Sequence, residues 1–215
     1  LFQKHSYPFG VMVNLDGNRY LDEGADFRNY TYVTYGRALL EQPNGLGFQI
    51  FDEKVKHLLR DEYHIPQVTM AQADTIEELA VRLDINPEGL VKTINEYNAA
   101  VQQDVPYNPT VKDGRGTVGI TPPKTNWAQT IDTPPYVGYA VTCGISFTFG
   151  GVKINTRGQV VTNGQDAIPG LYAAGEMVGG LFYYNYPGGS GLSAGMVFGR
   201  LAGTSAAQDA LAKKD

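Results

Sequence analysis

The spacing of apolar residues predicts two adjacent helices in the middle of the chain. Thr75 and Glu78 have the spacing of a capping box. Apolar residues then recur at helical spacing, namely Ile76, Leu79, Ala80 and Leu83. Asn86 and Pro87 are suited to begin a second helix as its N-cap and first residue, and its apolar positions run over 90–101. The second helix has no basic face, so packing is a better interpretation of the pair than DNA binding.

Shorter patterns predict strands and turns. The β-branched run 11–14, the Asp16-Gly17 turn and the segment 19–21 together predict a hairpin. Residues 136–142 alternate as a strand, and 150–161 predicts a second hairpin. A helix is expected over 53–60. The segment 104–135 is rich in Pro, Gly, Thr and Asp and is typical of a loop.

Glycine dominates the last third of the chain, since more than half of the 26 glycines lie in 144–203. Gly191, Gly195, Gly199 and Gly203 share one face of a helix expected over 190–212. Each costs about 1 kcal/mol relative to alanine in a helix interior, so the face indicates close approach of a backbone or a flat ligand. For Gly199 and Gly203, packing against a sheet is an equal alternative. Gly191, at the helix start, is expected to approach a ligand.

The loop before this helix has the composition of an anion-binding site. Pro187, Gly188 and Gly189 lead into Ser190 and Gly191, and a glycine-rich loop at a helix N-terminus presents free N–H groups. The segment also matches GxGxxG/A. An aromatic loop at 182–186 precedes it instead of a strand, so we do not interpret it as a dinucleotide fingerprint.

Composition excludes several classes of function. Of the 215 residues, 42% are hydrophobic and the net charge is −5, which argues against nucleic acid as a partner. The single Cys143 and three scattered histidines predict neither a disulfide framework nor a metal site. No apolar run approaches the roughly 18 residues of a membrane span, and the start lacks signal-peptide character. We expect a cytoplasmic protein, of which this chain, beginning at Leu1, is a piece.

Several motifs, taken in order, resemble the fumarate reductase/succinate dehydrogenase flavoprotein family. They read GNRYLDEGADF, FQIFDEKV, TIEELAVRLDINPEGLVKTINEYN, FTFGGVKIN and IPGLYAAGEMVGGLFYYNYPGGSGLSAGMVFGRLAG. The resemblance implies an α+β capping domain followed by the C-terminal strands and helix of a Rossmann-like α/β FAD-binding domain. Residues 1–7 would be a remnant of an upstream segment, 8–133 the capping domain and 134–215 the FAD-domain part. The N-terminal FAD-binding half would be missing.

The resemblance also implies which residues contact FAD. Glu176, next to Gly175, would bind the ribityl or adenosine part. The backbone of Ser190, Gly191 and Leu192 would face the isoalloxazine ring from the N-terminus of the glycine-rich helix. The full expected cofactor-binding set is Gly175, Glu176, Gly189, Ser190, Gly191, Leu192 and Ser193.

Departures from the family pattern bear on the substrate. Fumarate reductases carry His in H-T-M-G-G and Arg in N-R-L-G-G-N, where this chain has Phe147 and Tyr186, so fumarate reduction is disfavoured. Tyr186-Pro187-Gly188 resembles 3-ketosteroid Δ1-dehydrogenases, in which the tyrosine hydroxyl polarises a carbonyl. Phe147, Thr148 and Gly188 are expected to line the substrate site. Arg28 is the candidate for the catalytic arginine of the cap, with Arg37 as its rival.

Together these features predict part of an FAD-dependent enzyme that dehydrogenates a carbon–carbon bond. The strings SYPFG, DFRNYTY and NYPGGSGL resemble the tricarballylate dehydrogenase type, which implies a small polycarboxylate substrate and a separate electron acceptor. A 3-ketosteroid dehydrogenase-like or fumarate reductase-like enzyme is the alternative. A ligand-binding or assembly module without catalysis is the non-enzyme alternative. Arg28, Tyr186 and Arg37 are the catalytic candidates.

Overall fold

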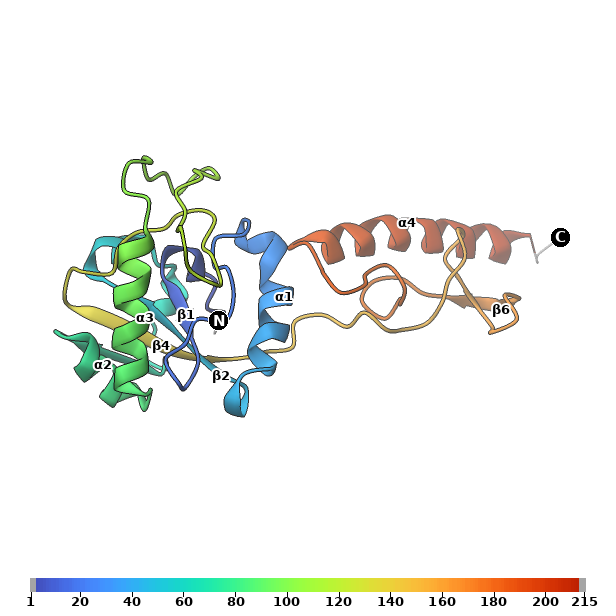
Figure 1. Ribbon diagram of the computed structural model, residues 1–215. Coiled ribbons are helices and arrows are strands. Elements are labelled where there is room, and N and C mark those ends of the chain that lie inside the picture. The colour runs from blue at the N-terminus through green and yellow to red at the C-terminus, as the bar shows by residue number, and fades with distance from the viewer. Residues whose placement is uncertain (1–2, 213–215) are drawn as a thin grey trace. The chain divides into compact units, whose positions relative to one another are not determined.

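The protein consists of two compact units, Leu1–Cys143 and Gly144–Asp215, in a computed structural model that describes residues 3–212 (Figure 1). Each unit mixes helices with strands and has buried clusters of its own. In the described part of the chain, no helix has the length and apolarity to cross a membrane. The same residues contain no group of three or more acidic, histidine or cysteine side chains suited to a metal.

A four-stranded antiparallel sheet forms the centre of the first unit. Its order is β1-β2-β4-β3. The strands are β1 (Val11–Val13), β2 (Leu46–Phe51), β3 (Met70–Ala73) and β4 (Tyr136–Thr142). The central β2–β4 pair places Phe48 opposite Ala140 and Ile50 opposite Gly138. The last strand therefore joins a sheet whose other members lie at least 60 residues earlier.

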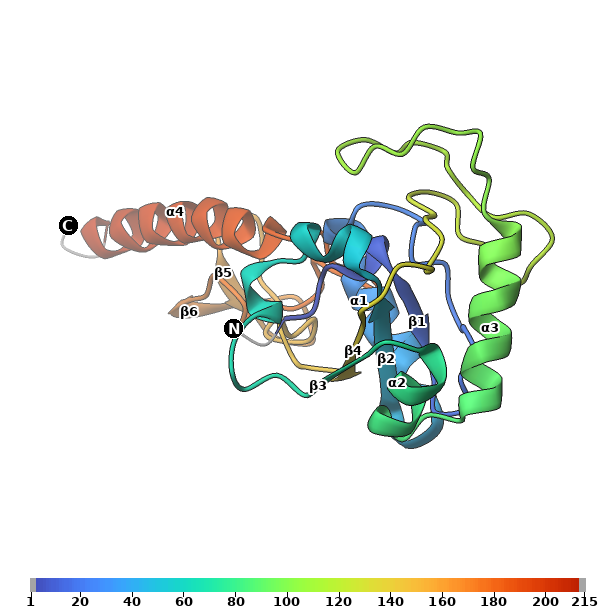
Figure 2. The ribbon, with the colours of Figure 1, turned by 90° about the vertical axis from the view of Figure 1, so that its left-hand side faces the viewer.

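Helices α2 (Ile76–Leu83) and α3 (Pro87–Ala100) cover one face of this sheet (Figure 2). The Thr75 hydroxyl accepts from the N–H of Glu78, and the Asn86 side chain accepts from Gly89, so both predicted caps are present. Between the helices and strands lies the largest buried cluster. Its members include Phe48, Ile50, Leu79, Leu83, Leu90, Ile94 and Tyr97.

The opposite face carries shorter elements and many tyrosines. The remaining helix is α1 (Arg28–Leu40), and four 3-10 turns are Tyr7–Phe9, Pro43–Gly45, Glu53–Leu58 and Asp61–Tyr63. Phe51, Tyr63 and Tyr139 pack edge to face with ring centroids 4.9–6.0 Å apart. Because side chains alternate along a strand, Phe51 points to this face while Ile50 points to the helices.

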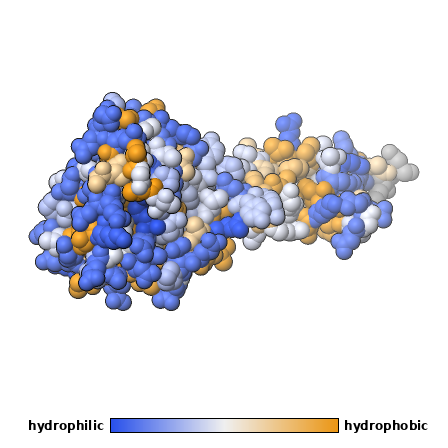
Figure 3. Space-filling view, in the orientation of Figure 1, coloured by the Kyte–Doolittle hydropathy of each residue, from blue (hydrophilic) through white to orange (hydrophobic). Residues whose placement is uncertain are grey.

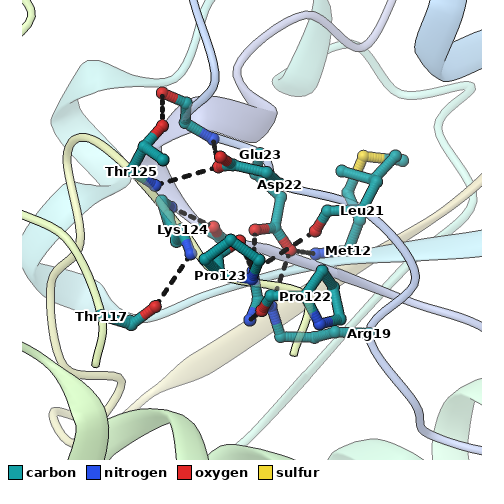
Figure 4. A network of polar contacts seen from close by, with 12 residues as sticks. Met12, Arg19, Leu21, Asp22, Glu23, Thr117, Pro122, Pro123, Lys124 and Thr125 are labelled. Atoms are coloured by element: carbon teal, nitrogen blue, oxygen red, sulfur yellow. Dashed lines mark hydrogen bonds and ion pairs between the residues drawn. The ribbon is translucent and has the colours of Figure 1, made fainter. Parts of the chain in front are cut away.

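A buried network of charges ties residues 10–24 to the segment 117–125 (Figure 4). Glu23, fully buried, forms an ion pair with Arg19 at 2.5 Å and accepts from the N–H of Met12. Lys124, also buried, donates to the carbonyl of Gly10 at 2.5 Å. Burial lowers the pKa of Lys124 to about 8, although the nearby Glu23 carboxylate opposes the change. The network therefore holds two cations and one central carboxylate away from water.

The second unit is smaller and is built around a long helix. Strands β5 (Gln159–Val161) and β6 (Ala167–Tyr172) pair antiparallel, and α4 (Ser190–Leu211) packs against β6. A Cβ added to Gly158 would lie 2.7 Å from Ala202, which shows how closely the strand turn approaches α4. Asp209 near the end of α4 accepts from Arg157 at 2.6 Å. The predicted glycine-rich helix is thus present and rests on strands.

Two local expectations differ from the structure. The segment expected as a helix over 53–60 forms a 3-10 helix, Glu53–Leu58. The hairpin expected over 11–21 is reduced to one bridge, Val13 with Arg19, while the full length of β1 pairs with β2. The β-branched run 11–14 predicted a strand correctly but could not identify its partner.

The division of the structure also falls elsewhere than the boundaries expected at residues 7 and 133. Ser6 and Tyr7 are buried in the first unit, where the Tyr7 hydroxyl bonds Thr31 at 2.8 Å. Strand β4 belongs to the sheet of the first unit, so the division follows Cys143. The roles of capping and FAD-binding domain stay predictions for the two units.

Candidate functional site

The first unit contains a cavity of about 270 Å³ at the N-terminal end of α1. Its lining combines two arginines and a histidine with an apolar wall. The lining residues are His5, Ser6, Pro8, Phe9, Phe27, Arg28, Arg60, Pro109 and Trp127. They come from five separate stretches of the chain, so the cavity exists only in the folded unit.

Arg28 is the first residue of α1 and one of the cavity's two arginines. The first turn of α1 has no acidic residue, and its N-cap Phe27 makes no side-chain cap bond. A positive side chain at the positive end of the helix dipole gains nothing from the dipole, and both charges attract an anion. Among the residues that the structure describes, no carboxylate lies within ion-pair distance of Arg28. Arg28 is therefore placed to hold a negatively charged ligand.

His5 contacts this guanidinium, with its Nδ1 atom 3.3 Å from Nη1 of Arg28. Burial lowers the pKa of His5 to about 4, and the positive charges of Arg28 and Arg60 lower it further in the same direction. His5 is consequently neutral at physiological pH, and in the tautomer with its hydrogen on Nε2 it accepts from Arg28. Its ring lies 5.1 Å from that of Tyr32. His5 orients Arg28 without adding charge to the cavity.

Arg60, the second arginine, has an acidic partner. Its guanidinium donates to both carboxylate oxygens of Glu62 at 3.2 Å, and these bonds lower the pKa of Glu62. Its backbone N–H donates to the hydroxyl of Ser6. The side chain is 41% exposed. The positive charge of Arg60 is thus compensated in place, whereas that of Arg28 is not.

Aromatic side chains, Phe27 and Trp127, form part of the cavity wall. Trp127 is 2% exposed, and its ring centroid lies 5.4 Å from that of Phe27. The indole Nε1 donates to the carbonyls of Asn108 and Val111 at 3.1 and 2.7 Å. These bonds fix the loop that carries Pro109 to the cavity wall.

The structure separates the two arginines that the sequence left as rivals. Arg37 lies nine residues after Arg28 on α1, which corresponds to about 13 Å along the axis. It is exposed and is not among the cavity's lining residues. The sequence patterns did not single out Arg60. As the chain's one tryptophan inside a loop segment, Trp127 was the available signal.

The glycine loop of the second unit differs from its expected geometry. The N–H of Gly191 does not face open space but donates to the Tyr186 hydroxyl at 3.1 Å. The N–H of Ser190 donates to Pro187, and that of Ser193 donates to Gly189. A Cβ added to Gly191 would lie 2.5 Å from the Tyr186 hydroxyl and 2.6 Å from the Phe147 ring. Close approach at Gly191 is therefore made by aromatic side chains of the same unit.

Phe147 and Tyr186 stack on each other, with centroids 4.8 Å apart and planes within 14°. Phe182 packs edge-on against both rings, at 5.6 and 4.9 Å. Phe147 and Tyr186 are the two positions at which the sequence departs from the fumarate reductase motifs. Both departures are aromatic, and the structure brings them into one cluster beside the N-terminus of α4.

The remaining expected residues are Glu176, Thr148, Gly175, Gly188, Gly189 and Leu192. The Glu176 carboxylate accepts from the N–H of Thr148 at 2.8 Å, so these two residues are bonded to each other. Gly175 and Gly189 both have positive φ, and a Cβ on either would have open space around it. Gly188 is exposed in the loop, and Leu192 is 78% exposed.

Comparisons with known proteins give a consistent result. The family model described as FAD binding domain matches residues 4–192. The probable fumarate reductase Ifc3 of Shewanella frigidimarina is 35% identical over 207 residues, covering 94% of this chain and 32% of that protein. The NADH:acrylate oxidoreductase of Vibrio harveyi is 30% identical over 206 residues, covering 91% of this chain and 18% of that protein. The chain thus spans about a third or less of the length of these curated relatives.

Solved structures agree at the level of the fold. The open conformation of a flavocytochrome c3 fumarate reductase matches with a TM-score of 0.68 and 32% identity, covering 98% of this chain and 35% of that chain. The 3-ketosteroid delta1-dehydrogenase of Sterolibacterium denitrificans matches with a TM-score of 0.69 at 24% identity, covering 96% and 41%. The chain accordingly has a partial flavoprotein fold of mixed α/β type.

Proposed function

Since the chain belongs to the FAD binding domain family, we propose that it is the part of an FAD-dependent oxidoreductase that holds the substrate and completes the cofactor site. The expected cofactor, FAD, is confirmed by this membership. The reaction we propose adds hydrogen to, or removes it from, a carbon–carbon bond next to a carboxylate or carbonyl group. The proposal rests on one observation, namely that Arg28 lines the cavity of the first unit and has no carboxylate within ion-pair distance among the described residues.

The second unit has surfaces that fit a flat cofactor. Gly175 and Gly189 leave open space where other residues would carry a Cβ. A residue with a side chain would fill this space. The N-terminus of α4 adds the positive end of a helix dipole, which suits the negative charge of a reduced flavin. Glu176 and the loop Gly188–Gly189 are the residues we propose beside the cofactor.

FAD, when bound, would supply the hydride chemistry of this reaction at one carbon of the substrate. The neighbouring carbon gains or loses a proton. Arg28 holds the substrate carboxylate by charge-assisted hydrogen bonds, which fixes the orientation of the bond that reacts. Bound to a carboxylate or a carbonyl, a guanidinium also stabilises negative charge that develops there when the adjacent carbon is deprotonated.

Tyr186 is the second residue to which we assign a role. The N–H of Gly191 at the start of α4 donates to its hydroxyl oxygen. This bond orients the phenol and leaves its own hydrogen to donate, so we propose that the hydroxyl donates to a carbonyl of the substrate. Such a role corresponds to the 3-ketosteroid dehydrogenase-like alternative.

The finer substrate assignment has three candidates. Relatives named as fumarate and acrylate reductases, and one named 3-oxosteroid 1-dehydrogenase at 26% identity, favour these types over a tricarballylate dehydrogenase. Phe147 and Tyr186 in place of two polar residues argue against fumarate itself. A tricarboxylate would need several cations, of which the cavity offers one that lacks an acidic partner.

The test uses the full-length protein with FAD bound. We expect flavin absorbance to bleach with a saturated carboxylate or to be restored by an unsaturated one. Arg28→Gln should lower kcat/KM by at least about a hundredfold, and Lys92→Gln, which removes an exposed cation of α3, should leave it unchanged. A comparable loss in Arg37→Gln alone would assign the role to Arg37. Full-length protein that takes up no FAD would favour the non-catalytic module.

A further inference from the structure

We propose that the cavity at the start of α1 takes a ligand with a single carboxylate and an apolar body, such as a ring or a short branched chain. The inference rests on the proposed function only where it identifies this ligand as the substrate. The binding itself is argued from the charges, the apolar wall and the volume of the cavity.

The charges around the cavity allow for one carboxylate. Arg28 provides one positive charge with no carboxylate in ion-pair range among residues 3–212. Arg60 is bound by Glu62 through two hydrogen bonds. His5 is neutral and already in contact with Arg28. A second carboxylate would have to displace Glu62 or remain unpaired, and an unpaired buried charge is strongly unfavourable.

The remaining wall offers apolar contact. Phe27, Trp127, Phe9 and Pro109 line the cavity, and both hydrogen bonds of the Trp127 indole are directed to backbone carbonyls of the loop. The indole therefore presents carbon surface to a ligand instead of a hydrogen-bond donor. Aromatic rings pack well against such a wall.

The volume limits the size of the apolar body. A closed apolar cavity of about 150 Å³ holds a benzene molecule. The cavity here has about 270 Å³, which accommodates one ring together with a short arm that reaches Arg28. A steroid-sized ligand would not fit inside it.

Trp127 makes the inference directly measurable. It is the chain's one tryptophan and lies in the cavity wall, so tryptophan emission of the 215-residue chain reports on occupancy. We would titrate hydrocinnamate, hydrocinnamyl alcohol and tricarballylate. We expect hydrocinnamate to give a saturable change in emission, and the alcohol and tricarballylate to bind at least about tenfold more weakly.

Variants assign the binding to named residues. Arg28→Gln should weaken hydrocinnamate by at least about tenfold and leave the alcohol unchanged, whereas Phe27→Ala should weaken both ligands. Lys92→Gln, on the exposed face of α3, is the matched control and should change neither. Arg28→Lys keeps the charge and should retain part of the affinity. Far-UV circular dichroism of each variant verifies folding.

The outcomes separate this inference from the proposed function. Tricarballylate binding as tightly as hydrocinnamate, or no saturable response to any probe, would overturn the inference. Binding that Arg28→Gln leaves intact would do the same. If hydrocinnamate binds as expected but the full-length protein with FAD neither reduces cinnamate nor oxidises hydrocinnamate, the cavity assignment stands and its identification as the substrate site fails.

Discussion

Arg28 and Arg60 have the same side chain in the same cavity, yet their surroundings give them different chemistry. Glu62 binds Arg60, while Arg28 contacts the neutral ring of His5. A neutral neighbour keeps the charge of Arg28 available to a ligand, and a carboxylate neighbour would have compensated it. The identity of the partner, and not of the arginine, decides which of the two can recognise an anion.

His5 gives the first unit a pH-dependent stability. Its folded-state pKa is about 4, below the ordinary 6.5, so the unfolded chain binds more protons between these values. The contribution of His5 to the free energy of unfolding is therefore constant above pH 6.5 and decreases as pH falls towards 4. Urea unfolding of His5→Gln should show a weaker decrease over this window than the unchanged chain.

The exposed His57 provides the control for this measurement. His57→Gln should keep the full pH dependence of the unchanged chain, because it leaves His5 and the burial of His5 in place. Identical pH profiles for His5→Gln and His57→Gln would show that burial of His5 has no energetic consequence.

Glu23 is the residue on which the buried charge network depends. Glu23→Gln preserves the shape but leaves Arg19 and Lys124 buried without their carboxylate. We expect the free energy of unfolding to fall by about 3 kcal/mol, measured by urea denaturation with Trp127 emission. Glu96→Gln breaks an exposed pair with Lys92 at 3.9 Å and should change stability by less than about 0.5 kcal/mol. Equal effects would mean that the buried pair adds no stability.

Among the elements, α1 shows how packing overrides local preference. Its sequence contains threonine, valine, glycine and three tyrosines, which are weak helix formers, and no apolar stripe predicted it. Tyr32, Tyr35 and Ala38 nevertheless pack against the buried cluster of Tyr7, Met12 and Leu21. The helix forms because these contacts need it, and its first residue becomes part of the cavity.

The glycines of α4 have different roles at the two ends of the helix. Gly191→Val would force a side chain into Tyr186 and Phe147, so we expect the aromatic stack to shift and FAD uptake to be severely weakened. Gly203→Ala has no atom within 4 Å of its Cβ and should leave flavin content nearly unchanged, with stability altered by about 1 kcal/mol. Flavin absorbance of both full-length variants, purified alike, measures the difference.

Equal flavin content in the two variants would contradict any cofactor role for the start of α4. Gly191 is packed by aromatic rings and bonded to the Tyr186 hydroxyl, so flavin could be lost from Gly191→Val either through the lost space or through the lost hydrogen bond. Tyr186→Phe removes the hydroxyl that bonds Gly191 while keeping the ring, and so separates a loss of the hydrogen bond from a loss of space.

For the molecule as a whole, the second unit exposes many large apolar side chains. Hydrophobic residues gather along α4 (Figure 3). The most exposed large apolar side chains of this unit are Ile145, Leu192, Met196, Met177, Leu211 and Val197. Contiguous apolar patches beyond a few hundred Å² mark interfaces. The N-terminal half of the FAD domain is the partner that we propose for this surface.

The 215-residue chain on its own should therefore bind a hydrophobic dye and self-associate. Replacing Leu192 and Met196 by lysine should reduce dye fluorescence and shift sedimentation towards the monomer, since both side chains are more than 75% exposed on α4. Val81→Lys, which alters an isolated exposed valine on α2, should change neither. A monomeric chain that binds no dye would contradict the interface.

Local sequence signals were sufficient for elements whose stability depends on neighbours in the chain. The Thr75 cap, the Asn86-Pro87 start, the alternation over Tyr136–Thr142 and the small-residue helix α4 were all predictable. Caps and periodic patterns act within one or two turns, so one sequence contains all the information they need. The ordered motifs likewise identified the cofactor family.

Long-range packing determined the rest, because contacts between distant segments leave no local pattern. Strand β1 pairs with β2, where Val11 lies opposite Ile50, 39 residues later in the chain. The hairpin inferred from the turn is limited to the single bridge between Val13 and Arg19. His5, Arg28, Arg60 and Trp127 meet in one cavity although long stretches of chain separate them. The burial that makes His5 neutral and the pairing that compensates Arg60 arise only when these segments come together, and so does the site that we propose at Arg28.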